Sequence, residues 1–136
     1  MKLQKLKKEH LETIRNIRNN NRQWFFNKLF ITQKQQKKWF NEVKKNKKIK
    51  FYVIIVKNNI AGAVSMTKTK EGIEIGNVLL DEKYKGQGVM TEAIKKLIKN
   101  NKKIFYARIL LDNNRSQLLF ERCGFKKTAY IMEYEC

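Results

Sequence analysis

A short glycine-containing stretch, residues 85–88 (Lys-Gly-Gln-Gly), has the residue types of an anion-binding loop. It follows a run rich in Ile, Val and Leu over residues 73–80 and precedes apolar residues at helical spacing over residues 89–99. Glycines let the main chain approach a ligand closely, and the first N–H groups of a helix have no partner within it. The stretch therefore predicts a site for a phosphate or diphosphate, although the same glycines can serve a strand-to-helix turn for steric reasons alone.

The rest of the sequence predicts the elements that position this loop. Apolar runs indicate strands, and apolar residues at a spacing of 3.6 indicate helices. Strands are expected over residues 2–6, 51–56, 60–67, 73–80, 103–111 and 125–135, and helices over residues 9–20, 33–46, 89–99 and from 113 or 114 to 124. This order predicts a single domain, residues 1–136, of the α/β (α+β) class. Its sheet would be mixed and mostly antiparallel, with a parallel β-α-β core and about four flanking helices.

Two blocks of the sequence resemble the GNAT superfamily of N-acetyltransferases. The family's loop pattern is Gln/Arg-x-x-Gly-x-Gly/Ala, and residues 85–90 follow it except for lysine at position 85 and methionine at position 90. The second pattern, Asn-x-x-Ala/Ser-x-x-x-Tyr/Phe with Gly-Phe beyond, matches residues 113–125. The order of elements also agrees over essentially the whole chain. The resemblance implies a GNAT-like fold and an enzyme that transfers acetyl from acetyl-CoA directly to a primary amine, in a ternary complex.

The resemblance also implies where acetyl-CoA binds. Main-chain N–H groups of the central strand would hold pantetheine, and one freed by a bulge would bind the oxyanion. The loop would hold the diphosphate, with Lys85 as a cation, and Phe120 would lie beside the thioester. The residues implied are Val78, Leu79, Leu80, Lys85, Gly86, Gln87, Gly88, Val89, Met90, Asn113, Ser116 and Phe120. Taken alone, Asn113 would be a helix cap and Phe120 a core residue.

Candidate catalytic residues follow from the same resemblance. Glu74 lies on the central strand beside the presumed thioester, so it is the best candidate for the base that deprotonates the acceptor; otherwise it is a strand carboxylate or part of a salt bridge. Many relatives protonate the leaving thiolate with a tyrosine at position 120, which is phenylalanine here. Since a thiol pKa of about 8.5 lets a thiolate leave without a strong acid, water, Tyr106 or Tyr130 would serve. His10, the only histidine, is expected to be solvated.

An aromatic patch beside an arginine, residues 22–26, joins the first two helices. In this family that region shapes the acceptor pocket. With residues 31–40 it resembles acetyltransferases of nucleotide-linked amino sugars, as in pseudaminic-acid pathways, and residues 86–94 also resemble ribosomal-protein N-terminal acetyltransferases. Trp24 and Phe25 would stack on a uracil or thymine base, and Arg22 would pair with a diphosphate. Alternatively these aromatic residues, like Trp39 and Phe40, pack in the core.

The charge balance is strongly basic, with 31 Lys and Arg against 12 Asp and Glu and a net charge of +19. The lysines are spread over nearly every segment, which favours solvated helix faces over a nucleic-acid-binding module. A non-catalytic acetyl-CoA-binding protein is a further alternative. No apolar run reaches the ~20 residues of a membrane span and no apolar leader follows the N-terminus, so a cytoplasmic protein without a membrane partner is expected.

Cysteine usage and the last sheet edge give two further expectations. Cys123 and Cys136 show no metal-ligand spacing, so free thiols and no metal are expected. Many family members have one more strand after residues 125–135, so the last edge of the sheet is expected to be open or completed by a partner, such as a second copy in a homodimer.

Overall fold

The computed structural model describes residues 1–135. One five-stranded sheet runs through it in the order β1-β2-β3-β4-β5. The strands are β1 (Lys2–Lys5), β2 (Ile49–Val56), β3 (Asn59–Lys68), β4 (Ile73–Leu80) and β5 (Phe105–Tyr106). The helices are α1 (Leu11–Asn20), α2 (Gln33–Lys45), α3 (Val89–Ile98) and α4 (Asn114–Arg122). Short 3-10 turns cover Lys8–His10, Arg22–Trp24 and Glu82–Tyr84.

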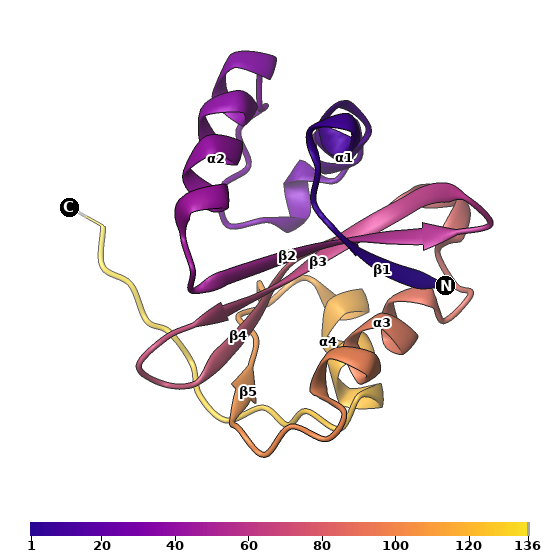
Figure 1. Ribbon diagram of the computed structural model, residues 1–136. Helices are drawn as coiled ribbons and strands as arrows, with labels where there is room; N and C mark the ends of the chain where they lie inside the picture. The colour runs from indigo at the N-terminus through magenta and orange to yellow at the C-terminus, as the bar shows by residue number, and fades with distance from the viewer. Residues whose placement is uncertain (136) are drawn as a thin grey trace.

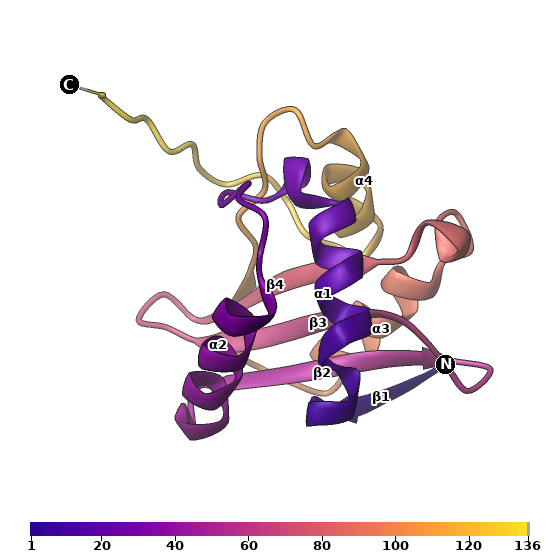
Figure 2. The same ribbon diagram turned by 90° about the horizontal axis from the view of Figure 1, so that it is seen from above.

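Two helices cover each face of the sheet (Figure 1). Helices α1 and α2 lie on one face and α3 and α4 on the other, and the view from above shows α1 crossing the strands (Figure 2). Successive side chains of a strand point to opposite faces. Val53 and Ile54 of β2 accordingly belong to different apolar clusters, with Ile17 of α1 in one and Ile94 of α3 in the other. Because both faces are covered, the inner strands are nearly continuous apolar runs.

Strand pairing follows the predicted pattern. Neighbouring strands from β1 to β4 pair antiparallel. Strands β4 and β5, which precede and follow α3 in the sequence, pair in parallel. The tight turn between β2 and β3 has left-handed backbone at Lys57 and Asn58, as two-residue hairpins require. The mixed, mostly antiparallel sheet with a β-α-β core and four α-helices confirms the predicted fold class.

Two predicted strands differ from the structure. Only Phe105 and Tyr106 of the strand expected over residues 103–111 pair with β4. Beyond them, β4 and the segment that follows β5 separate. The strand expected over residues 125–135 is wrong, since no strand forms in this segment: Phe125 packs against the core, and the later residues extend away from the body of the molecule (Figure 1, yellow). Its apolar side chains at positions 130, 131, 132 and 134 are 66–95% exposed. Strand propensity needs a neighbouring strand, and this segment pairs with none among residues 1–135.

Several further expectations concern partners and redox state. Cys123 is a half-buried free thiol, whereas Cys136 lies outside the described residues. No helix in the described part of the chain is both long and apolar enough to cross a bilayer. Within residues 1–135, no three His, Cys, Asp or Glu side chains gather as metal ligands.

Candidate active site

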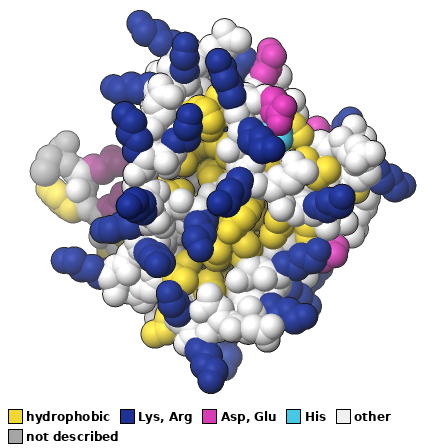
Figure 3. All heavy atoms as spheres, in the orientation of Figure 1, with side chains coloured by type: hydrophobic (Ala, Val, Ile, Leu, Met, Phe, Trp, Pro, Cys, Tyr) yellow, Lys and Arg dark blue, Asp and Glu magenta, His cyan; other side chains and the backbone are white. Residues whose placement is uncertain are grey.

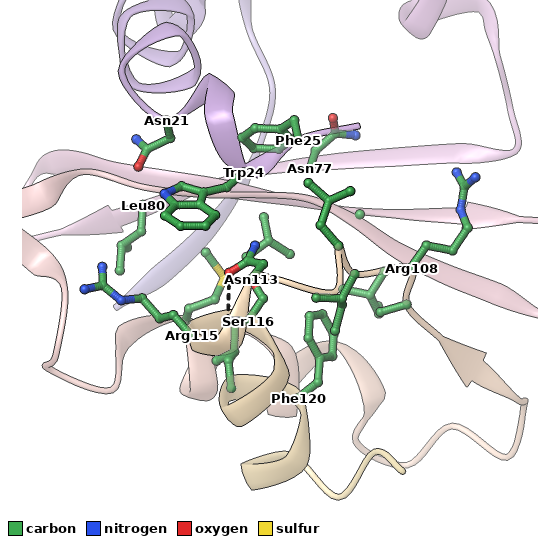
Figure 4. Close-up of a pocket in the computed structure, with 18 of the residues that line it drawn as sticks. Asn21, Trp24, Phe25, Asn77, Leu80, Arg108, Asn113, Arg115, Ser116 and Phe120 are labelled. Carbon is green, nitrogen blue, oxygen red and sulfur yellow. Dashed lines mark hydrogen bonds between the residues drawn. The ribbon is translucent and has the colours of Figure 1, made fainter. Parts of the chain in front are cut away.

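The separation of β4 from the chain after β5 opens a cleft of about 910 Å³. Its walls come from β4, the start of α3, residues 107–110 and α4, and the connection between α1 and α2 covers it (Figure 4). The structure thus brings together five segments of the chain. The predicted site residues that line the cleft are Trp24, Phe25, Glu74, Val78, Leu80, Lys85, Gly86, Gly88, Val89, Met90, Asn113, Ser116 and Phe120.

Residues 86–91 carry unpaired main-chain N–H groups at one end of the cleft. Gly86 and Gly88 have φ angles of 80° and 74°, a region that glycine adopts without strain. Within residues 1–135 none of these six N–H groups donates a hydrogen bond, and the first bond of α3 runs from Glu92 to the Gly88 carbonyl at 3.0 Å. A Cβ on either glycine would meet no atom within 4 Å, so the space above the loop is open. Such a helix start suits a diphosphate.

The cations at this end are arranged differently from the prediction. The Nζ atom of Lys85 lies 2.7 Å from the Glu82 carboxylate and donates to Oδ1 of Asn21 at 2.9 Å, which ties the loop to the end of α1. The hydrogen bond and charge of Lys85 lower the pKa of the Glu82 carboxyl, and Arg115 contributes. The Gln87 side chain donates to the Lys83 carbonyl and does not line the cleft. Arg115, which the sequence analysis missed, does line it.

A bulge in β4 shapes the middle of the cleft. Ala63 and Ser65 of β3 stand opposite Leu79 and Gly76, so β4 has one extra residue between these pairs. Asn77, within the bulge, has a φ of 49°. Its side-chain amide donates to the Ser65 hydroxyl at 2.9 Å, and Ser65 is 1% exposed. This hydrogen bond fixes the bulge, because its Ser65 hydroxyl is buried and would be costly without a partner.

The bulge leaves part of the β4 edge facing the gap between β4 and the segment that follows β5. The Asp81 N–H bonds to the Ala61 carbonyl of β3 at 2.7 Å. Since successive N–H groups of an extended strand point in opposite directions, that of Leu80 faces away from β3. Leu79 has its side chain packed with α1 on the other face of the sheet, 3% exposed, and does not line the cleft.

The second block forms the start of α4 and the wall beneath the cleft. Oδ1 of Asn113 accepts a hydrogen bond from the Ser116 N–H at 3.2 Å (Figure 4), and so caps the helix as predicted. The Phe120 ring is 4% exposed and packs edge-on against Phe125, with ring centroids 5.0 Å apart. These residues therefore have structural roles and also line the cleft.

Glu74 lies where β4 and β5 part, and its carboxylate is paired with Arg108. The Nε and Nη2 atoms of Arg108 lie 2.7 and 3.5 Å from its two oxygens. The hydrogen bond and charge of Glu74 raise the pKa of the Arg108 guanidinium. The salt-bridge alternative is therefore present in the structure. The pair does not use all the lone pairs of the carboxylate, which leaves acceptor positions for a ligand.

The aromatic patch covers the cleft. The Arg18 guanidinium stacks on the Phe25 ring at 3.9 Å, and burial lowers the pKa of that arginine. The Trp24 indole, 41% exposed, extends over the cleft toward α4 (Figure 4). Trp39 and Phe40, by contrast, agree with the core alternative: the Trp39 ring lies 5.2 Å from that of Phe51 in β2, and Phe40 is 7% exposed.

Besides Leu79 and Gln87, three more predicted residues are not brought to the cleft. The Tyr106 hydroxyl hydrogen-bonds with that of Thr69 at 2.8 Å, and Tyr130 is 80% exposed in the C-terminal segment. Arg22 donates to the Asn19 carbonyl at 3.0 Å. None of the three lines the cleft.

The expectation that His10 is solvated is wrong. Its side chain is 6% exposed, and Nδ1 accepts a hydrogen bond from the Lys7 N–H at 3.0 Å. The imidazole thus satisfies a free main-chain N–H just before α1.

The fold and cleft define an α/β protein whose ligand site lies between two parting parallel strands, beside a glycine loop that starts a helix. The family described as acetyltransferase (GNAT) domain matches residues 1–126. The chain therefore belongs to the GNAT acetyltransferase family. This confirms, at the level of the family, the prediction of an acetyltransferase that uses acetyl-CoA as its co-substrate.

Solved structures share the fold along nearly the whole chain. Spermidine N-acetyltransferase from Vibrio cholerae, in complex with CoA and spermine, is 18% identical with a TM-score of 0.84, covering 98% of this chain and 85% of that one. Ribosomal-protein-alanine N-acetyltransferase from Brucella melitensis is 15% identical with a TM-score of 0.80, covering 95% and 86%. An N-acetyltransferase from Staphylococcus aureus Mu50 is 19% identical with a TM-score of 0.80, covering 94% and 84%. Comparison with curated proteins found no match.

Proposed function

We propose that this protein transfers acetyl from acetyl-CoA to the primary amine of a nucleotide-linked amino sugar, by direct attack in a ternary complex. One observation carries the donor half: residues 86 and 88–91, whose main-chain N–H groups are unpaired within residues 1–135, line the same cleft as the free edge of β4. The loop would hold the diphosphate, with Arg115 nearby. The β4 edge would hold the pantetheine arm and lead the thioester toward Glu74.

In the transfer the amine nitrogen forms a bond to the acetyl carbon while the carbon–sulfur bond breaks. One proton passes from the nitrogen to water, and one reaches the sulfur from water, so that protons and bonds balance. We assign Glu74 to orienting the amine through the lone pairs that Arg108 does not use, and the Val78 N–H at the bulge to the oxyanion. Since Phe120 has no proton to give and neither candidate tyrosine lines the cleft, water would protonate the thiolate, whose thiol has a pKa of about 8.5.

The acceptor assignment is supported by the residues that line the cleft. Trp24 and Phe25 offer aromatic faces for a base, and the cations lining it are Lys85, Arg108, Arg115 and Arg122. Such a site favours an acceptor that carries phosphate. A protein α-amino group is the second candidate, because the Brucella enzyme of the same fold is named for a ribosomal-protein alanine.

Thermal unfolding with acetyl-CoA, coenzyme A or a short DNA duplex tests the donor half. Acetyl-CoA at 100 times its dissociation constant should stabilise the protein by about 2.7 kcal/mol, and the duplex should not. Coenzyme A release is then measured with a UDP- or dTDP-linked amino sugar and with an N-terminal peptide. Activity on the peptide alone would end the sugar proposal. Stabilisation without turnover of any amine would instead indicate a non-catalytic acetyl-CoA-binding protein.

A further inference from the structure

Arg108 is a cation at the Glu74 end of the cleft whose role in acceptor choice is open. Figure 4 shows it at the opposite end from Arg115. Its guanidinium pairs with Glu74, with Nε at 2.7 Å, and its central carbon lies 5.6 Å from the centre of the Phe26 ring. Two contacts from two different elements, β4 and the α1–α2 connection, thus hold the guanidinium. The side chain is still 56% exposed.

Most of the hydrogen-bonding capacity of Arg108 is unused. An arginine has five N–H groups, and the contacts with the two Glu74 oxygens engage two of them. Within residues 1–135 the guanidinium has no other hydrogen-bond acceptor. The remaining N–H groups lie in one plane, an arrangement that suits two oxygens of a carboxylate or phosphate.

The other charges of the cleft favour the same sign of ligand. Three carboxylates line the cleft, those of Glu74, Glu82 and Asp112. Glu74 and Glu82 are already paired with cations of the cleft, at 2.7 Å in each case. In this cleft the unpaired cations therefore outnumber the unpaired carboxylates. A polyamine would bring several more ammonium groups, and these positive charges would repel those of the cleft.

We propose that Arg108 selects acceptors that carry a phosphate or carboxylate on the same molecule as the amine, and disfavours polyamines. The proposal rests on the acetyltransferase function above. Glu74 holds the guanidinium and faces the amine, while the outer N–H groups of Arg108 bind the anion. This arginine takes the role that the sequence analysis gave to Arg22, which does not line the cleft.

The experiment compares matched acceptors in the full chain. Initial rates are measured with an amino-sugar phosphate, the same amino sugar without phosphate, and spermidine. The variants are Arg108→Gln, Arg108→Lys and, as a matched loss of one charge outside the cleft, Lys37→Gln. The parent should prefer the phosphorylated sugar through a lower KM. Arg108→Gln should lose roughly 10- to 100-fold in kcat/KM for that acceptor, mostly in KM, as expected for a charge-assisted bidentate contact, and the loss should be much smaller for the sugar without phosphate. Arg108→Lys should recover part, and Lys37→Gln should match the parent.

Stabilisation by acetyl-CoA shows that each variant is folded and separates the two proposals. A parent enzyme that acetylates spermidine in preference to the phosphorylated sugar would overturn the role of Arg108 and leave the acetyltransferase function intact. The same holds if Arg108→Gln keeps the parent's preference. If the parent neither binds acetyl-CoA nor transfers acetyl to any amine, both proposals fail together.

Discussion

At the scale of single residues, Phe120 joins the core to the cleft. Its buried ring packs against Phe125 on one side and lines the cleft on the other. Phe120→Ala should lower the free energy of unfolding by about 3–5 kcal/mol, since it removes a large buried side chain and leaves a cavity. It should also weaken stabilisation by acetyl-CoA. Urea unfolding with and without ligand measures both effects.

Leu118 provides the control on the same helix, because it is 53% exposed. Leu118→Ala should change stability by no more than about 0.5 kcal/mol, as surface substitutions usually do. Equal losses in the two variants would contradict the packing described for Phe120.

Residue identity also limits what the sequence could predict. The role of Asn113 as a helix cap depends on a neighbour three residues away, and the structure confirms this cap. The pair of Arg108 with Glu74 joins positions 34 residues apart. Nothing local marks that arginine, because it lies within an apolar run that predicts a strand. Arg22, beside three aromatic residues in the sequence, attracted the prediction instead.

At the scale of elements, the loop before α3 gives a sharp test of the donor site. Gly88 has left-handed backbone, so Gly88→Ala should cost about 1 kcal/mol of stability in the free protein. The added methyl group would occupy the open space above the loop. Acetyl-CoA should therefore stabilise the variant much less than it stabilises the parent, as thermal unfolding would show.

Gly124 is the matched control. It also has a positive φ, 93°, and a Cβ there would meet no atom within 4 Å, but it follows α4 rather than preceding α3. Gly124→Ala should carry a similar stability cost and keep the full acetyl-CoA effect. A parallel loss of ligand stabilisation in both variants would argue against a diphosphate site at residues 86–91.

The bulge in β4 depends on a close approach of β3. A Cβ at Gly62 would collide with the Leu79 carbonyl oxygen, which belongs to the main chain and cannot rotate away. Gly62→Ala should lower the midpoint of thermal unfolding by roughly 3–5 °C or more, since a domain of this size loses about that much for each kcal/mol of stability. Gly76→Ala, whose Cβ would lie 3.6 Å from the Ser65 hydroxyl, should lower it far less. Circular dichroism compares them, and equal midpoints would contradict the register.

The elements also show why the sequence does not predict the separation of β4 from the segment that follows β5. Residues 103–111 are rich in Ile, Leu and aromatic side chains, and local propensity does not report where a neighbouring strand ends. The pairing of β4 with β5 stops after Glu74 and Tyr106, so the cleft arises from a missing partner rather than from a change in sequence. The same reason explains residues 125–135, whose composition favours a strand that finds no neighbour.

At the scale of the whole molecule, charge is distributed rather than gathered. Lys and Arg side chains are scattered over the whole face seen in Figure 3, with few acidic residues among them. This surface should attract acetyl-CoA from all directions. Raising salt from about 0.05 M to 0.5 M should therefore increase the KM for acetyl-CoA, since the screening length falls below about 10 Å. Steady-state kinetics measures it, and a KM independent of salt would argue that only contacts within the cleft matter.

The extended C-terminal segment has a practical consequence for the thioethers of the chain. Met132 is 95% exposed, whereas Met90, beside the glycine loop, is 4% exposed. Mild peroxide treatment should therefore convert Met132 to its sulfoxide long before it reaches Met90. Mass spectrometry of tryptic peptides would follow the two oxidations over time. That of Met132 should leave catalysis unchanged, and the later one of Met90 should coincide with inactivation.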